Sequence, residues 1–197
     1  MRDAIVSCMA IAQCSSIRIM PAKEQLRRAM RDRLPLPPDQ RGEKSARICA
    51  AIVALPQWHS THTVAIFAPQ QREPDVELLW RHTDGKIVCY PRVVPDGLAL
   101  FSVESLYDLQ PGKWGIREPG DDPSRLIFPA NVDLILVPGV AFTRAGARCG
   151  RGGGYYDRLL ASLPAHACKI GVCFALQIVD ELPTEPHDVG VDFVITE

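Results

Sequence analysis

Glycines and charged side chains are concentrated between residues 146 and 158 of this 197-residue chain. The segment contains Gly146, Gly150, Gly152, Gly153 and Gly154, together with Arg148, Arg151 and Asp157. Glycines let the backbone adopt positive φ and approach a ligand closely, and the free N–H groups of such a loop favour an anion. Asp157 would serve the dipole of the helix that follows or bind a hard cation. The spacing therefore favours a site for phosphate chemistry.

The same segment also fits a surface loop in which Asp157 is an ordinary acid at a helix start. It is neither a P-loop nor a dinucleotide fingerprint, because it lacks Gly-Lys-Ser/Thr and its glycine spacing differs. We favour the anion site because the loop joins a strongly apolar strand to a helix, and because Arg148 and Arg151 add positive charge.

A second candidate is the basic stretch between Arg18 and Arg47. It holds nine of the 22 Lys and Arg residues and four acids, so its local formal charge is +5. Lys23 and Arg27 are one helical turn apart and would reach phosphates together. The alternative is a helix face whose charges are simply solvated.

Acidic residues in two further segments are candidate ligands. Asp75 follows the first predicted strand, and we expect it to cap the next helix. The segment 185–192 contains His187, Asp188 and Asp192. One histidine makes no zinc site, but Asp188 and Asp192 together with Asp157 would supply oxygen ligands for Mg2+, which typically takes one or two carboxylates plus substrate phosphates. Spacing alone does not decide between this site and a structural role.

Alternating helices and strands must position these segments. Apolar residues at helical spacing predict helices over 22–33, 39–55, 76–82 and 155–163, the second of them capped by Asp39. Apolar runs predict strands over 64–68, 86–90, 98–103, 132–137, 169–174 and 193–196. The alternation favours a mainly parallel sheet with helices on both faces. Ligand sites in such sheets lie beyond the carboxyl ends of strands, here at residues 69–74, 138–154 and 174–177.

Length and composition fit a single α/β domain over residues 21–197. We expect residues 1–20 to be a loose extension, with Met20 as an alternative start. Their short apolar stretch only weakly resembles an export signal, so a cytoplasmic protein is expected. The net charge of −1 argues against a nucleic-acid binder that works by bulk positive charge.

Two further compositional features bear on the class of protein. No apolar run of the sequence reaches the roughly 18 residues that a membrane-spanning helix needs. The seven cysteines are odd in number and include no C-x-x-C pair, which predicts reduced and mostly buried thiols rather than disulfides or a zinc site.

Several motifs together resemble the 5-formyltetrahydrofolate cyclo-ligase family, also called methenyltetrahydrofolate synthetases. The most specific are Val-Pro-Gly-Val-Ala-Phe at 137–142 and Gly-Arg-Gly-Gly-Gly-Tyr-Tyr-Asp-Arg at 150–158. Supporting motifs are Lys-Glu-Gln-Leu-Arg at 23–27, Trp-Gly-Ile-Arg-Glu-Pro at 114–119, and His187-Asp188 with Asp192. The resemblance runs from Lys23 to Thr196.

The resemblance implies a three-layer α/β/α sandwich with a mainly parallel central sheet. It implies an enzyme that uses ATP and Mg2+ to convert 5-formyltetrahydrofolate into 5,10-methenyltetrahydrofolate, ADP and phosphate. The implied ATP contacts are Lys23, Arg27, Arg148, Gly150, Arg151, Gly152, Gly153, Gly154, Tyr155 and Tyr156. The implied folate contacts are Ala68, Glu73, Trp114, Arg151, Gly152, Gly153, Gly154 and Tyr155. By the same resemblance Asp157 and Asp188 would hold Mg2+, and the catalytic residues would be Arg151, Tyr155 and Asp157.

Two residues depart from the family pattern. Gly153 stands where the family often has lysine, and Cys149 replaces a larger residue. The phosphate charge would then be met by the arginines of the loop, by Lys23 and Arg27, and by Mg2+. We expect somewhat weaker ATP contacts rather than lost activity.

Two other functions are compatible with the same residues. One is a relative that binds folate or nucleotide without cyclising it. The other is a sugar-phosphate isomerase of similar layered architecture, which would need a phosphate site but neither ATP nor Mg2+. For the cyclo-ligase, the expected partners are ATP and 5-formyltetrahydrofolate with or without a polyglutamate tail. We expect no nucleic-acid or membrane partner, and a monomer.

Overall fold

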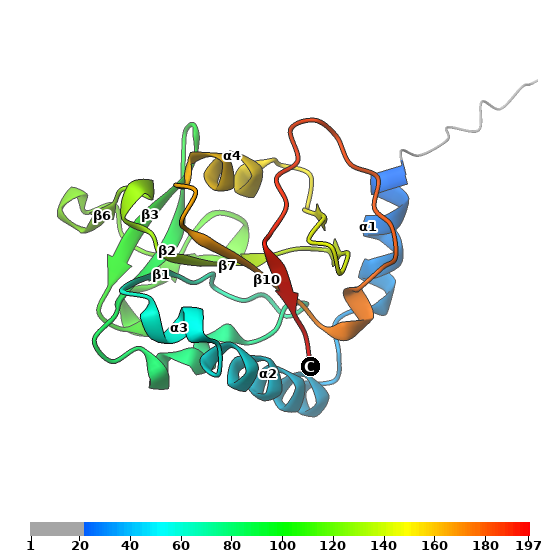
Figure 1. The fold of residues 1–197 in the computed structure, drawn as a ribbon, viewed down its shortest axis with the longest axis horizontal. Helices are drawn as coiled ribbons and strands as arrows, with labels where there is room; N and C mark the ends of the chain where they lie inside the picture. Colours follow the sequence, from blue (N-terminus) through cyan, green and yellow to red (C-terminus); the bar gives the residue numbers. More distant parts are fainter. Residues whose placement is uncertain (1–21) are drawn as a thin grey trace, which may run out of the picture.

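A seven-stranded sheet runs through the computed structural model, which describes residues 22–197 (Figure 1). Its strands lie in the order β11-β10-β7-β1-β2-β3-β6. Their bounds are β1 Thr63–Ala65, β2 Ile87–Val94, β3 Gly97–Val103, β6 Leu126–Ile127, β7 Leu134–Pro138, β10 Cys168–Val172 and β11 Phe193–Ile195. The strands from β11 to β2 are parallel, whereas β3, near the other edge, runs antiparallel to both of its neighbours, β2 and β6. The prediction of a mainly parallel sheet is confirmed.

The residues of β7 show why this sheet needs a layer on each side. Leu134 and Leu136 belong to one core cluster, whereas Ile135 and Val137 belong to another, and all four are buried. Successive side chains of a strand point to opposite faces, so a continuous apolar run is stable only between two layers.

Helices supply these two layers. They are α2 Pro38–Val53, α3 Pro56–Ser60, α4 Tyr155–Ser162 and the 3-10 helix η1 Val76–His82. A further helix, α1, spans Ala22–Arg33. Figure 1 shows α2 and α3 on one side of the sheet and α4 on the other. Ile48 of α2 and Trp58 of α3 join the first core cluster, and Leu159 of α4 joins the second. The expected α/β fold with helices on both faces is confirmed.

Helix α1 lies outside these layers, against the ribbon formed by β8 (Ala141–Phe142) and β9 (Arg148–Cys149). Met30 of α1 is buried with Ala141 and Cys149 in a small apolar cluster. This contact places the basic residues of α1 beside the glycine-rich loop, which we define as residues 150–154.

Short elements fill the chain between β3 and β7. They are η2 Leu106–Asp108, β4 Gln110–Pro111, η3 Lys113–Gly115, β5 Arg117–Glu118, η4 Pro123–Arg125 and η5 Pro129–Asn131, and η6 Ala175–Gln177 follows β10. Strands β4 and β5 pair in antiparallel fashion around η3. We call residues 110–118 the flap.

Local sequence signals located the helices but not all of their details. The helix predicted over 22–33 is α1, with the same bounds. Asp75 caps η1 as predicted, since its side chain accepts a hydrogen bond from the Glu77 N–H at 3.3 Å. The predicted cap by Asp39 is wrong, because α2 begins at Pro38 and its N-cap residue is Pro37. Proline suits a first helical position, where an N–H would have no partner in the helix.

The described cysteines agree with the expectation of buried thiols. All five are free and four of them are buried. Burial raises the pKa of Cys49, Cys89 and Cys173 to about 12, so these thiols are protonated and unreactive at neutral pH. Within residues 22–197 no helix is long and apolar enough to cross a membrane. The predictions of an extension over 1–20 and of a start at Met20 lie outside the described residues.

Candidate active site

The three loops predicted to carry ligand sites meet at the carboxyl ends of β1, β7 and β10. Gln177, after β10, donates hydrogen bonds from Nε2 to the backbone oxygens of Gly139 (3.0 Å) and Val140 (3.1 Å), after β7. Gln70, after β1, accepts a hydrogen bond from Arg151 of the glycine-rich loop. The loops that the strand-end rule singles out are therefore adjacent at this edge of the sheet.

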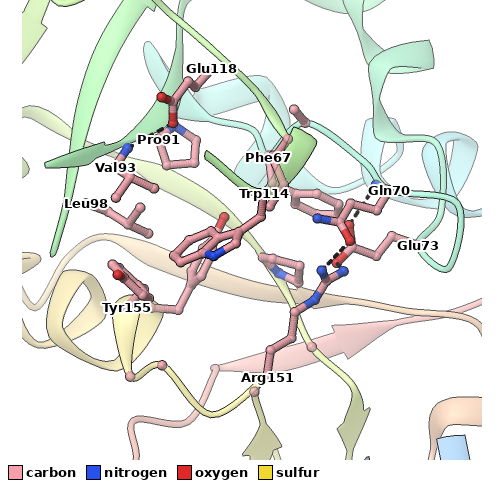
Figure 2. A pocket seen from close by; sticks show the side chains of 18 of the residues that line it. Phe67, Gln70, Glu73, Pro91, Val93, Leu98, Trp114, Glu118, Arg151 and Tyr155 are labelled. Atoms are coloured by element: carbon pink, nitrogen blue, oxygen red, sulfur yellow. Dashed lines mark hydrogen bonds and ion pairs between the residues drawn. The ribbon is translucent and has the colours of Figure 1, made fainter. Parts of the chain in front are cut away.

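A cavity of about 340 Å³ opens beside these loops, and we call it the main cavity. Its apolar wall is made of Phe67, Pro91, Val93, Leu98, Trp114, Ile116 and Tyr155. Its polar wall includes Gln70, Glu73, Arg148, Arg151 and Asp157. Figure 2 shows the indole ring of Trp114 extending toward Tyr155. A cavity of this kind suits a ligand with a planar apolar ring and reactive polar atoms.

Trp114 lies at the tip of the flap in an unusual backbone conformation. Its φ of 58° and ψ of 22° are left-handed, a region that residues with a side chain rarely adopt. Its side chain is 61% exposed, yet the ring meets Tyr155 edge to face with centroids 5.4 Å apart. At the base of the flap, buried Glu118 accepts a hydrogen bond from the Val93 N–H of β2 at 3.1 Å. Glu118 also fills the space beside Gly112, where a Cβ would lie 2.2 Å from the Glu118 Cδ.

Arg148 and Asp157 form a buried ion pair in the polar wall. Their NH2 and Oδ1 atoms are 2.5 Å apart, and the two side chains are 3% and 15% exposed. Asp157 Oδ1 also accepts a hydrogen bond from the Val189 N–H at 3.2 Å. Both contacts use Oδ1, which leaves Oδ2 for a ligand. The buried Nε of Arg148 has no hydrogen-bond partner among residues 22–197. A buried N–H without a partner costs about 1–3 kcal/mol, so a ligand oxygen here would be stabilising.

Close packing explains two of the glycines. Gly154 is the N-cap residue of α4 with a φ of 64°, a conformation that favours glycine. At Gly153 a Cβ would lie 2.7 Å from the Tyr155 ring, so a larger residue requires the ring to move. The guanidinium of Arg158 lies over the same ring, 5.1 Å from its centroid. The backbone of the glycine-rich loop is therefore packed tightly against the aromatic wall.

Arg151 joins the glycine-rich loop to the loop after β1. Its NH2 lies 2.6 Å from Glu73 Oε1, and its NH1 donates a hydrogen bond to Gln70. The other oxygen of buried Glu73 accepts a hydrogen bond from the Gln70 N–H at 2.9 Å. Figure 2 shows Arg151, Gln70 and Glu73 joined in this way. Ala68, three residues beyond the end of β1, also lines the main cavity. The structure thus brings together all the residues that the resemblance implied for folate, except Gly152, which does not line the cavity.

Lys23 forms ion pairs with Asp188 (2.6 Å) and Glu185 (3.2 Å). Burial by itself lowers the pKa of Lys23, but hydrogen bonds to the two carboxylates outweigh this effect and raise the pKa above its usual 10.5. Burial by itself raises the pKa of Asp188, but hydrogen bonds from Lys23 and from the Glu185 N–H leave it below its usual 3.8. The Lys23–Asp188 pair is therefore charged at neutral pH.

The two predicted metal ligands lie in one neighbourhood. Val189, the residue after Asp188, donates a hydrogen bond to Asp157, which ties the two acidic segments together. Asp188 also forms a cluster with Glu185 and His187. One potential ligand atom of each residue lies within 4.8 Å of those of the other two. The ammonium group of Lys23 already balances part of the negative charge of this cluster.

Asp192 has the structural role that the sequence left open. Its Oδ2 accepts a hydrogen bond from the Lys169 N–H at 2.7 Å, at the start of β10. Its backbone N–H donates to the oxygen of the same lysine at 2.8 Å. These bonds fix the last loop of the chain against the sheet and so help to position Asp188.

A smaller cavity of about 190 Å³ adjoins the main one, and we call it the basic cavity. The two cavities share Gln70, Glu73, Gly139 and Arg151. The remaining lining residues of the basic cavity are Arg27, Met30, Arg31, Leu34, Arg72, Val140 and Gln177. Arg27 also donates a hydrogen bond from Nε to the Gly150 oxygen at 2.8 Å, which fixes the start of the glycine-rich loop to α1.

Comparison with known proteins assigns the chain to a family. Residues 19–197 match the model of the 5-formyltetrahydrofolate cyclo-ligase family. The chain belongs to this family. The 5-formyltetrahydrofolate cyclo-ligase of Mus musculus is 29% identical over 197 residues, which cover 93% of this chain and 97% of the relative. That of Escherichia coli K12 is 30% identical over 172 residues, which cover 83% and 93%.

Solved structures agree with the assignment. This cyclo-ligase family member resembles the 5,10-methenyltetrahydrofolate synthetase of Aquifex aeolicus with a TM-score of 0.78 and 32% identity over 88% of each chain. It resembles the synthetase of Mycoplasma pneumoniae with a TM-score of 0.71 and 25% identity over 89% of this chain and 99% of the other. The family predicted from the motifs is confirmed.

Several cavity residues of this cyclo-ligase family member were not predicted. In the main cavity they are Phe67, Pro91, Val93, Leu98, Ile116, Arg117 and Glu118, and in the basic cavity Met30, Arg31 and Leu34. Gln70, Arg72, Pro138, Gly139 and Gln177 lie in the three segments predicted to carry ligand sites. Two of the unpredicted residues carried a usable signal. Glu118 belongs to the Trp-Gly-Ile-Arg-Glu-Pro motif, and Arg31 lies one turn beyond Arg27 on α1. The apolar residues of β2 and β3 carried none, because they also fit an ordinary buried strand.

Proposed function

We propose that this enzyme uses ATP and Mg2+ to cyclise 5-formyltetrahydrofolate to 5,10-methenyltetrahydrofolate, releasing ADP and phosphate. One observation carries the proposal. The main cavity sets an aromatic wall opposite a wall that includes the glycine-rich loop and Arg148, whose buried Nε has no partner among the described residues. The pterin ring fits the first wall, and a phosphoryl group is the ligand that glycine-rich backbone and guanidinium groups favour.

The chemistry requires an activated oxygen. A formamide oxygen is a poor leaving group, so N10 cannot close the ring by expelling it unaided. In the proposed reaction the formyl oxygen attacks the γ-phosphorus of ATP, the bond from that phosphorus to ADP breaks, and ADP leaves. N10 then bonds to the formyl carbon, the carbon–oxygen bond breaks, phosphate leaves, and N10 loses its proton to water.

Phosphoryl transfer of this kind depends on position and charge more than on covalent help from the protein. We assign the triphosphate to Lys23, Arg27, Arg148, Tyr156 and the glycine-rich loop. Tyr156 supports Arg148, whose guanidinium lies over its ring at 5.9 Å. Arg151 and Tyr155 stand between the two substrates, where Arg151 would meet the oxygen that receives the phosphoryl group. We assign no protein nucleophile, and burial raises the pKa of Cys149, the cysteine next to the loop.

The folate is assigned to the remaining walls of the main cavity. Trp114 and Tyr155 would stack against the pterin, because their rings form the apolar surface at the mouth of the cavity. The small side chain of Ala68 leaves room in the loop that follows β1. Glu73 holds Arg151 through a 2.6 Å ion pair and would keep that guanidinium in place between the substrates.

The donor set of the site fits Mg2+. Asp157 and Asp188 supply hard carboxylate oxygens, and one oxygen of each lies outside their strong hydrogen bonds. Arg148 and Lys23 orient these carboxylates. When bound, the ion would neutralise charge on the phosphates of ATP.

We also propose that the enzyme acts as a monomer in the cytoplasm on these small molecules. Residues of one chain form every wall of both cavities. Free, buried cysteines suit a reducing compartment.

The test is a spectrophotometric assay that follows the methenyl chromophore. The purified chain is mixed with 5-formyltetrahydrofolate, ATP and Mg2+, beside samples without ATP, with EDTA, and with the Asp157→Ala variant. We expect the chromophore to grow only when ATP and metal are both present, and to collapse in the variant. A flat trace from folded protein that still binds ATP or folate would instead support a binding protein. Turnover that survives chelation would argue against the metal assignment.

A further inference from the structure

The buried side chain of Gln177 joins the ends of two neighbouring strands, β10 and β7. Its Oε1 accepts a hydrogen bond from the Phe174 N–H at 2.9 Å, within the loop after β10. Its Nε2 donates to the oxygens of Gly139 (3.0 Å) and Val140 (3.1 Å), after β7. An N–H only donates and a carbonyl oxygen only accepts, so these partners fix the orientation of the amide. Among side chains of this length, only glutamine offers an uncharged acceptor together with two donors.

The peptide unit between Gly139 and Val140 extends this constraint to the glycine-rich loop. Its oxygen accepts from Gln177, and its N–H donates to the Cys149 oxygen at 2.8 Å. Cys149 directly precedes Gly150, where the glycine-rich loop begins. Because a peptide unit is planar and rigid, a rotation of this one would break both bonds. The amide of Gln177 therefore holds the base of the loop through a single peptide.

Arg148 packs against the same peptide unit. A Cβ added at Gly139 would lie 3.3 Å from the Arg148 Cγ and 2.6 Å from the Phe142 ring, so the backbone fills this space. The buried guanidinium of Arg148 pairs with Asp157. A displacement of Gly139 would therefore also displace Arg148, which is assigned to the phosphates of ATP.

We propose that Gln177 is a positioning residue for phosphoryl transfer: it holds the peptide between Gly139 and Val140, and thereby sets the place of Arg148. The inference rests on the proposed function, because it takes Arg148 as a group that contacts the triphosphate. Gln177 would act on the reaction through this arginine and without touching a substrate.

The donors of Gln177 also matter for the charge of the site. The carbonyl oxygens of Gly139 and Val140 carry partial negative charge, and Gly139 lines both cavities. Carbonyl oxygens without a donor would oppose the binding of a phosphoryl group and the negative charge that its transfer develops. Gln177 Nε2 pairs both oxygens within the protein.

Two other roles for Gln177 must be separated from this one. Gln177 lines the basic cavity, so the first alternative is direct contact with a ligand. The hydrogen bonds of Nε2 argue against it, because such a contact would have to replace one of them. The second alternative is that Gln177 only stabilises the fold.

The experiment is a double-mutant cycle between Gln177→Met and Arg148→Lys, in which the measured quantity is kcat/KM for ATP. Methionine has nearly the volume of glutamine but has no donor. A further variant, Gln177→Glu, is assayed at mildly alkaline pH, where the carboxyl is ionised. It keeps the acceptor for the Phe174 N–H and loses only the donors.

The matched control is Asp133→Ala. Asp133 also joins two neighbouring strands, because its Oδ2 accepts hydrogen bonds from the N–H groups of His62 and Thr63, each at 2.8 Å. These bonds lie at the start of β1 and β7, and Asp133 lines neither cavity. The control therefore measures the effect of losing a bridge between strands away from the site.

We expect Gln177→Met and Gln177→Glu each to lower kcat/KM for ATP about tenfold. KM for folate should change by less than about twofold, because Gln177 does not line the main cavity. In the Arg148→Lys background the loss of Gln177 should cost about twofold or less, since the group that it positions is already altered. The control should lower the melting temperature but keep kcat/KM.

Three results would overturn the proposal. Equal losses in both backgrounds would mean that Gln177 contacts ATP itself or supports the fold as a whole. An unchanged kcat/KM in Gln177→Glu would mean that the donors do not matter. If circular dichroism shows that neither Gln177 variant folds, the residue serves the fold alone and the proposal fails.

The Kd of ATP with Mg2+, measured by calorimetry for the four proteins of the cycle, separates this inference from the proposed function. A wild type that forms no methenyl product, but in which Gln177 and Arg148 are coupled in the Kd of ATP, would support the positioning role and reject the cyclo-ligase activity. Turnover with additive losses would reject the positioning role and support the activity.

Discussion

The glycine-rich loop and the flap both line the main cavity, but the fold holds them in different ways. The loop and the residues that flank it are fixed by charge at several points: Arg148 pairs with Asp157, Arg151 pairs with Glu73, and Arg27 holds the oxygen of Gly150. The flap is held by charge at its base, where Arg117 pairs with Glu77, and where Glu118 pairs with Arg92 and accepts a hydrogen bond from the Val93 N–H. At its tip it presents Trp114, which is 61% exposed.

The difference matches the two tasks assigned to the cavity. Phosphoryl transfer depends on charges that are already in position, because their reorientation during the reaction would cost energy. Binding an apolar ring is less directional and depends mainly on the area removed from water. Changes in the loop should therefore lower kcat, whereas changes in the flap should raise KM for folate. Four variants test this division.

The largest effect is expected at Asp157. The Asp157→Asn variant keeps the shape of the side chain but removes the charge that balances Arg148 and would hold Mg2+. We expect kcat to fall about a hundredfold, which corresponds to about 3 kcal/mol of transition-state stabilisation, with little change in KM for folate. Steady-state kinetics give both constants. The control is Asp108→Asn, which breaks an ion pair with Arg125 outside both cavities. A variant that keeps kcat but binds folate poorly would contradict the division.

A large but different effect is expected at Trp114. Trp114→Ala removes the edge-to-face contact with Tyr155 and the surface assigned to the pterin. We expect KM for folate to rise about tenfold, or about 1.4 kcal/mol, while kcat stays within about threefold. The melting temperature should be unchanged, because the side chain is mostly exposed. Tyr107→Ala is the control, since Tyr107 is 97% exposed and lines neither cavity. A collapse of kcat at constant KM would show that Trp114 acts on the chemical step.

The sequence predicted some elements of the fold and missed the way in which others pair. The continuous apolar run of β7 and the helical spacing of α1 depend on neighbours in the chain, so both elements were located from sequence. The antiparallel pairing of β2 with β3 depends on contacts between strands, and the sequence analysis placed neither strand in the sheet order. The capping residue of α2 was also misassigned, because an aspartate and a proline both favour a helix start.

The same reasoning applies to the site. The glycine-rich loop and its charges are contiguous, so the sequence located them and the structure brings them to one cavity. Glu118 lies in a motif and Arg72 in a loop that the sequence singled out, but their contacts with Val93 and Leu34, which are distant in the chain, follow from no local pattern. The sequence therefore located these segments, whereas the contacts by which they support the cavity were not predicted.

An intermediate effect is expected at Glu118. Glu118→Ala removes the acceptor for the Val93 N–H and opens the space beside Gly112, so the tip of the flap should lose its fixed position. We expect KM for folate to rise about fivefold, from a lost hydrogen bond of about 1 kcal/mol. Acrylamide should quench the fluorescence of Trp114 more strongly in Glu118→Ala than in the wild type. The signal of the other tryptophans is measured in the Trp114→Phe variant and subtracted.

The matched variant is Glu118→Gln, whose amide oxygen can accept the same hydrogen bond. It should restore both KM and the quenching profile. A glutamine variant as impaired as the alanine variant would mean that the negative charge is needed, and the ion pair of Glu118 with Arg92 would then be the first contact to test.

The smallest effect is expected from the Lys23–Asp188 pair in the pH dependence of stability. The pKa of Asp188 is lowered, so its contribution is present above pH 3.8 and is lost as the pH falls through the lower folded value. The pKa of Lys23 is raised, so its contribution is present below pH 10.5 and is lost as the pH rises through the higher folded value. Urea unfolding should therefore give free energies of unfolding for the wild type and Lys23→Met that differ by a constant amount between these two pH limits. The expected difference is about 1 kcal/mol or less. A difference that varies across neutral pH would point to another titrating group.

The packing at Gly153 also limits how this enzyme can change over evolutionary time. A side chain at this position meets the Tyr155 ring at 2.7 Å, and that ring in turn meets Trp114. A lysine, which the family pattern often shows here, requires the ring to move first or at the same time. A substitution at Gly153 therefore acts on the flap through two rings in succession, first Tyr155 and then Trp114.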